Sequence, residues 1–126
     1  MKLLIVDDSE EMRGEIRSIV AGIASVVYEC ANGPDALAMY PVHRPDWVLM
    51  DIVMEPIDGL EATRLLISSF PDAKIAIVTS YDDDYLREAA HAAGARAYVM
   101  KENLLELRRV LEGAADSDRK LGPDST

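Results

Sequence analysis

The stretch "VLMDIVMEPIDGL" (residues 48–60) brings a carboxylate, Asp51, to the end of a short apolar run and continues into a loop that contains Pro56 and Gly59. The run before Asp51 is apolar at every position, which is typical of a strand buried on both faces. A helical pattern, "LEATRLLISSF", follows and stops before Pro71. The stretch therefore predicts a buried strand, a polar loop and a helix in succession.

The same unit recurs along the whole chain. Five short apolar runs rich in β-forming residues alternate with helical patterns, the last of which follows Asn103, a suitable N-cap. The expected strands are Leu3–Val6, Val26–Cys30, Trp47–Met50, Ile75–Val78 and Ala97–Met100. Strands that alternate with helices predict an α/β fold, with a parallel sheet covered by helices on both faces.

Composition narrows the class of protein. A chain of 126 residues builds one domain with one core, which we expect over residues 1–112, with residues 113–126 as a tail or the start of a linker. The net charge of −10 argues against direct binding to nucleic acids or anionic membranes. No apolar run approaches 18 residues, and the N-terminal run is too short for a signal peptide, so we expect a cytoplasmic protein. The only cysteine, Cys30, is expected to be a free thiol.

Polar residues follow four of the five strands. Asp7 and Asp8 follow the first, Asp51 the third, Thr79 the fourth and Lys101 the fifth. With strand order 2-1-3-4-5 these four strands are consecutive neighbours, and their carboxyl ends meet where open α/β sheets bind ligands. We therefore expect all five side chains to converge on one site.

Three carboxylates in one site need a compensating charge. Two unit charges about 4 Å apart repel by roughly 4 kcal/mol at an effective dielectric near 20, so one group is protonated or a cation binds. Oxygen ligands next to a loop suit Mg²⁺. A phosphoryl group needs its oxygens neutralised, which Mg²⁺, Lys101 and Thr79 together can do. Taken singly, each residue also has an ordinary structural explanation, such as an aspartate that caps a helix; the joint placement favours a site.

The segments "LLIVDDSEEMR", "DWVLMDIVM…IDGLEATR" and "IAIVTSYDDDYLREAAHAAGARAYVMK" resemble the receiver domain of bacterial two-component response regulators, the CheY-like family. The resemblance covers about residues 2–112, and its last segment is most similar to the LuxR/NarL-type subgroup, which usually carries a helix-turn-helix output domain. It implies a flavodoxin-like, doubly wound fold with five helices around a five-stranded parallel sheet.

The resemblance also implies roles for individual residues. Asp51 would accept a phosphoryl group, and Lys101 would contact the phosphoryl oxygens. Asp8 would bind Mg²⁺ directly, Asp7 would bind it through water, and the backbone carbonyl of Val53 would be a further ligand.

A switch is implied as well. Thr79 would hydrogen-bond the phosphoryl group and Tyr98 would swing inward, which changes the surface of the fourth helix, fifth strand and fifth helix. The donor would be a sensor histidine kinase or a phosphotransfer protein, and the chain would not be a turnover enzyme. Its downstream partner would be another protein or a separate DNA-binding output domain, and a phosphorylation-dependent homodimer is a further expectation. We expect slow self-dephosphorylation, since Val53 offers no hydrogen bond to water and Tyr81 shields the site.

Two positions depart from the family pattern. Glu55 stands where the family usually has proline, and Glu102 stands where proline often follows the lysine. Three other functions are compatible with an α/β fold of this kind. An aspartate-nucleophile phosphatase of the haloacid dehalogenase type needs a second aspartate at the position of Val53, and a flavodoxin-like nucleotide binder would be opposed by the acidic first loop. A phosphorylation-independent adaptor remains open.

Overall fold

Strands and helices alternate through the computed structural model, which describes residues 1–113. The strands are β1 (Lys2–Val6), β2 (Val26–Cys30), β3 (Trp47–Met50), β4 (Ile75–Thr79) and β5 (Ala97–Met100). The helices are α1 (Glu10–Val20), α2 (Gly33–His43), α3 (Gly59–Ser69), α4 (Asp84–Ala93) and α5 (Leu105–Leu111), with a 3-10 turn, η1 (Lys101–Asn103), before α5. All five predicted strands are present, and β4 extends one residue further than predicted to include Thr79.

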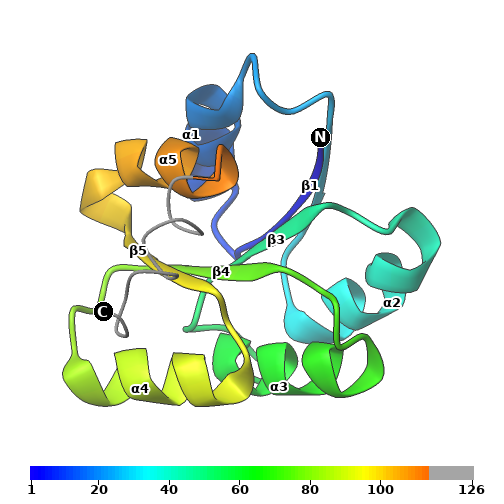
Figure 1. The fold of residues 1–126 in the computed structure, drawn as a ribbon, viewed down its shortest axis with the longest axis vertical. Coiled ribbons are helices and arrows are strands. Elements are labelled where there is room, and N and C mark those ends of the chain that lie inside the picture. The colour runs from blue at the N-terminus through cyan, green and yellow to red at the C-terminus, as the bar shows by residue number, and fades with distance from the viewer. Residues whose placement is uncertain (114–126) are drawn as a thin grey trace.

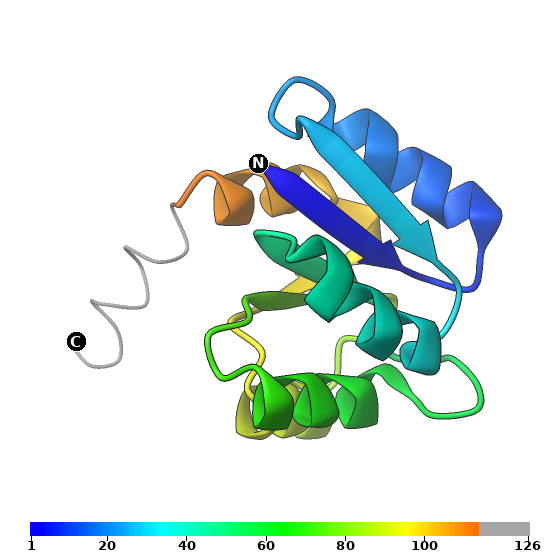
Figure 2. The same cartoon turned by 90° about the vertical axis from the view of Figure 1, so that its right-hand side faces the viewer.

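The five strands form one parallel sheet in the order β2-β1-β3-β4-β5, as predicted. Figure 2 shows β1 and β2 side by side, with the connection to α1 leaving the end of β1. Val6 pairs with Met50 across β1 and β3, so the residues that follow these strands, Asp7 and Asp51, emerge next to each other. This doubly wound, flavodoxin-like order is what places the polar strand ends together.

Helices cover both faces of the sheet (Figure 1). On one face α1 and α5 pack against alternate strand residues such as Leu3 and Ile5, and on the other α2, α3 and α4 pack against Leu4 and Val6. These four strand residues are all fully or almost fully buried. Burial on both faces explains the continuous apolar runs, and each buried Leu or Ile stabilises the fold by about 1.5–3 kcal/mol.

Side-chain caps define the first residues of most helices. A side-chain oxygen of each capping residue accepts a hydrogen bond from a backbone N–H in the first turn, as expected for N-caps. These residues are Ser9, Asn32, Asp58 and Asp83. The predicted N-cap at Asn103 is wrong, because η1 takes up Asn103 and α5 begins at Leu105 without a side-chain cap. Gly94 ends α4 in the left-handed conformation, at φ 108°, as its position predicted.

Within residues 1–113, no helix is long and apolar enough to cross a membrane. The last helix ends at Leu111, close to the predicted domain boundary at residue 112. The predicted tail lies, from residue 114 on, outside the described residues.

Candidate functional site

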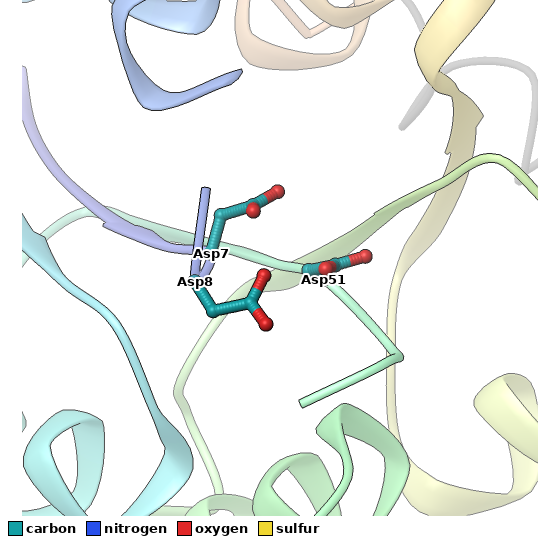
Figure 3. A group of neighbouring side chains, drawn as sticks. All are labelled: Asp7, Asp8 and Asp51. Atoms are coloured by element: carbon teal, nitrogen blue, oxygen red, sulfur yellow. The ribbon is translucent and has the colours of Figure 1, made fainter. Parts of the chain in front are cut away.

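Three carboxylates meet at the carboxyl ends of β1 and β3. Figure 3 shows Asp7 and Asp8 projecting from the end of β1, and Asp51 from the end of β3, into one shared space. Each offers a carboxylate oxygen, and these oxygens all lie within 4.8 Å of one another. Asp7 and Asp51 are buried, with 1% and 6% of their surface exposed, whereas Asp8 is exposed. The predicted convergence of these three residues is therefore present in the structure.

Lys101 places a positive charge between two of the acids. It follows β5 directly, and its Nζ lies 3.1 Å from Asp7 Oδ2 and 3.3 Å from Asp51 Oδ1. Burial alone would lower the pKa of Lys101, but the contact with Asp7 and the charge of Asp51 outweigh it, so the pKa is raised. The side chain is consequently an ammonium ion at neutral pH.

The surroundings of Asp51 disfavour the charged form of its carboxyl group. Burial raises its pKa above the ordinary value, and the neighbouring charge of Asp7 raises it further. Lys101 and the N–H of Ile52, which donates to Asp51 Oδ1 at 2.9 Å, act in the opposite direction without cancelling the rise. An additional cation beside Asp51 would lower this cost.

Asp7 is held in place from two sides. The N–H of Ser9 donates to Asp7 Oδ1 at 2.9 Å. Arg13 on α1 donates from Nη1 to the Asp7 backbone carbonyl at 2.6 Å and from Nε to Glu29 on β2 at 2.9 Å. Asp7 Oδ2 is buried and, among the described residues, accepts no well-aligned hydrogen bond, so it retains lone pairs that face Lys101. Arg13 was not among the predicted site residues; it lies at the end of the first turn of α1, and no motif in the sequence marks it.

These donors fit a small divalent cation. They are oxygens only, one of them, Asp7 Oδ2, is buried and accepts no well-aligned hydrogen bond beside its ion pair with Lys101, and the three acids carry more negative charge than Lys101 neutralises. Mg²⁺ prefers such carboxylate oxygens and retains several of its waters, which the exposed side at Asp8 would accommodate.

Gly59 fixes the loop that follows Asp51. A Cβ atom at this position would lie 1.8 Å from the backbone oxygen of Asp51, and the N–H of Gly59 donates to the carbonyl of Ile52 at 2.7 Å. Only glycine permits this approach, so the first turn of α3 lies directly against the backbone of the candidate nucleophile.

The β3–α3 loop carries the residues that depart from the family pattern. The Glu55–Pro56 peptide bond is cis, a feature that was not predicted, and Glu55 is exposed. Val53 is 55% exposed. Its backbone carbonyl as a metal ligand stays a prediction.

The two predicted switch residues contact the same residue of the β4–α4 loop. Thr79 is fully buried, and its Oγ1 accepts a hydrogen bond from the N–H of Tyr81 at 3.2 Å. The hydroxyl of Tyr98 donates to the Tyr81 carbonyl at 2.6 Å. Arg87 on α4 lies over the Tyr98 ring, 4.5 Å from its centroid, and pairs with Asp82. Neither the shared contact at Tyr81 nor the position of Arg87 was predicted.

The sequence profile of the response regulator receiver domain matches residues 3–112. The chain belongs to this family. An uncharacterized transcriptional regulatory protein of Bacillus subtilis, YhcZ, is 39% identical over 119 residues, and the response regulator GacA of Pseudomonas aeruginosa is 38% identical over 120. Each alignment covers 90% of this chain and 56% of the relative, so this receiver domain spans about half the length of those proteins.

Solved structures agree with this assignment. A two-component response regulator of the LuxR family from Aurantimonas has a TM-score of 0.84 at 28% identity, covering 92% of this chain and 85% of that one. A CheY-like receiver domain protein from Methanospirillum hungatei has a TM-score of 0.82 at 26% identity, covering 96% and 98%.

The resemblance found in the sequence, including the similarity to LuxR/NarL-type receivers, is confirmed. The general function of such a domain is a phosphorylation switch in a two-component system, and the relatives are signalling proteins, not turnover enzymes.

Proposed function

We propose that this receiver domain is a phosphoacceptor in a phosphorelay, in which Asp51 accepts a phosphoryl group from a phosphohistidine of a sensor kinase or phosphotransfer protein. A carboxylate oxygen of Asp51 forms the new bond to phosphorus, and the bond from phosphorus to the imidazole nitrogen breaks, with its electron pair staying on that nitrogen. The observation that carries this proposal is the ion pair of Lys101 with both Asp7 and Asp51 at the end of the sheet.

The chain's own residues supply most of what the transfer needs. Lys101 is placed to neutralise a phosphoryl oxygen, since its ammonium already lies 3.3 Å from Asp51 Oδ1. Asp7, Asp8, Asp51 and the backbone carbonyl of Val53 would hold Mg²⁺. When bound, Mg²⁺ supplies Lewis-acid stabilisation of the charge on the phosphoryl oxygens. The raised pKa of Asp51 means that the reactive carboxylate is lost at a higher pH than for an exposed aspartate.

The switch would start at Thr79. Because Thr79 Oγ1 accepts its bond from Tyr81, the hydroxyl proton of Thr79 remains available to a phosphoryl oxygen. A shift of Thr79 toward that oxygen would move Tyr81, whose carbonyl holds the hydroxyl of Tyr98. The surface formed by α4, β5 and α5 would then change by a shift between two populated states.

The domain would act in the cytoplasm, hydrolyse its own phosphoryl group slowly behind Val53 and Tyr81, and pass the signal to a downstream protein or an output domain. A phosphorylation-dependent homodimer would be one form of that output.

The test is incubation with acetyl phosphate and Mg²⁺, followed by measurement of the mass of the intact protein. Wild type should gain one phosphoryl group and Asp51→Asn none. Asp58→Asn is the matched control, because Asp58 lies in the same loop and asparagine keeps its N-cap role on α3. Equal gain by wild type and Asp51→Asn, or no gain by either, would exclude the proposal.

A further inference from the structure

Glu29 is the one acidic residue inside the five strands that residues 1–113 form. It lies on β2, pairs in register with Ile5 of β1, and has 26% of its side chain exposed. β2 is also the strand that no polar residue of the candidate site follows. A largely buried carboxylate needs partners, and Glu29 has two of them, Arg13 and Arg17 of α1.

Arg13 joins Glu29 to the candidate site. Its Nε donates to Glu29 Oε1 at 2.9 Å, and its Nη1 donates to the backbone carbonyl of Asp7 at 2.6 Å. A guanidinium is planar and its donors have fixed directions, so the two hydrogen bonds together fix its orientation. Only 17% of the Arg13 side chain is exposed, and its removal from water strengthens both contacts.

The carbonyl that Arg13 contacts belongs to the peptide between Asp7 and Asp8. The same peptide carries the N–H of Asp8, so its orientation sets the direction in which the exposed Asp8 side chain leaves the backbone. Asp7 has further contacts of its own. Its N–H donates to the carbonyl of Cys30 at 3.1 Å, and its Oδ1 accepts from the N–H of Ser9. The contact from Arg13 is the one that holds the carbonyl of the linking peptide.

Glu29 also acts through its charge. Arg13 ends beside two residues whose carboxylates accept hydrogen bonds more strongly than a carbonyl does. Without Glu29, the guanidinium would be free to turn from the Asp7 carbonyl to the carboxylates of Asp7 and Asp8, where it would compete with a metal cation. Glu29 neutralises Arg13 and holds it away from those carboxylates.

We propose that Glu29 is a positioning residue of the site. It acts through Arg13, which it holds on the peptide between Asp7 and Asp8 and keeps away from the acids that would bind Mg²⁺. The part that concerns Mg²⁺ rests on the proposed function, whereas the part that concerns the loop does not. The alternative is a purely structural ion pair, which would hold α1 to β2 without changing the affinity of the site.

The experiment uses the full ¹⁵N-labelled chain, first with a chelator and then, after its removal, in a titration with magnesium chloride. The variants are Glu29→Gln, Arg13→Gln, their combination, and Glu15→Gln, which removes an exposed charge from α1. Glutamine keeps the size of Glu29 but must turn an NH₂ group toward one of the two arginines. With the chelator, Glu29→Gln and Arg13→Gln should both shift the amide resonance of Asp8, because its N–H shares a peptide with the contacted carbonyl.

In the titration, each of Glu29→Gln and Arg13→Gln should weaken Mg²⁺ binding about tenfold, as the loss of a residue that orients a metal ligand does. The double variant should bind within about twofold of Arg13→Gln, because both substitutions break the same link. Glu15→Gln should change the affinity less than about twofold, since solvent and salt screen an exposed charge.

An unchanged affinity of Glu29→Gln, an equal loss with Glu15→Gln, or a loss of about a hundredfold in the double variant would overturn the proposal. Affinity is measured on folded protein, so a loss of stability alone leaves it unchanged. If the wild type bound no Mg²⁺, the proposed function would fail. The amide of Asp8 in the chelated samples would still decide the role of Glu29 in the loop, since an unmoved resonance in Glu29→Gln excludes it.

Discussion

Replacing Lys101 by methionine should leave the fold with two uncompensated buried carboxylates. Nζ lies 3.1 Å from Asp7 Oδ2 and 3.3 Å from Asp51 Oδ1, so at an effective dielectric of about 20 each attraction is about 5 kcal/mol. Several kcal/mol of that sum is offset by the cost of removing the ammonium from water. We therefore expect Lys101→Met to lower the free energy of unfolding by about 3–5 kcal/mol at neutral pH, as for other buried pairs that lose one member.

The assay is urea unfolding at pH 7 with a chelator present, for wild type, Lys101→Met and the double variant with Asp51→Asn. Because the loss comes from unpaired negative charge, removing the charge of Asp51 in the Lys101→Met background should recover at least about 1 kcal/mol. Lowering the pH should reduce the difference in unfolding free energy between Lys101→Met and wild type, because protonation removes the unpaired charge of Asp51. The pKa of Asp51 is already raised, so this protonation begins at a higher pH than for an exposed aspartate. A loss below about 0.5 kcal/mol, or no recovery in the double variant, would refute this reasoning.

Gly59→Ala should cost about 3 kcal/mol in urea unfolding, because the new Cβ would overlap the backbone oxygen of Asp51; an unchanged midpoint would contradict it. Arg13→Gln should weaken Mg²⁺ binding about tenfold by calorimetry, because Arg13 donates to the backbone carbonyl of Asp7. Arg17→Gln is the control and should leave Mg²⁺ binding unchanged, because Arg17 contacts the same Glu29 but not that carbonyl. Burial raises the pKa of Cys30 to about 11, so its thiol should react about a hundredfold more slowly at pH 8 than in the unfolded chain, and about tenfold faster for each pH unit gained; rapid labelling of the folded protein would disagree.

The strands and their order could be predicted because burial acts directly on sequence pattern. A strand covered on both faces is apolar along its length, as β3 is and as β4 is from Ile75 to Val78, and such runs are hard to mistake. The start of α5 was mispredicted at Asn103 because N-cap preference is a local signal. Here the backbone turns into η1 immediately after β5, so that the residue best suited to cap is already in a helical turn.

Some residues of the candidate site could be predicted from the sequence and others could not. Asp7, Asp51 and Lys101 could be brought together from sequence, because each follows a strand directly and the strand order fixes its neighbours. Arg13 could not, since its contact with the Asp7 carbonyl depends on how α1 is placed relative to β1 and to Glu29 on β2. The Tyr81 contacts of the switch residues likewise depend on the path of a loop, which has no periodicity to reveal it.

The dispersal of the site over three strands makes it a reporter of the whole fold. Asp7, Asp51 and Lys101 follow β1, β3 and β5, so they form a site only when β1, β3, β4 and β5 are paired. A ligand of that site binds the folded chain and not the unfolded one, and at a hundredfold excess over its dissociation constant it stabilises the fold by about 2.7 kcal/mol. Occupancy of the pocket can thus be measured from a melting curve, and in a cell the same linkage would slow the degradation of liganded molecules.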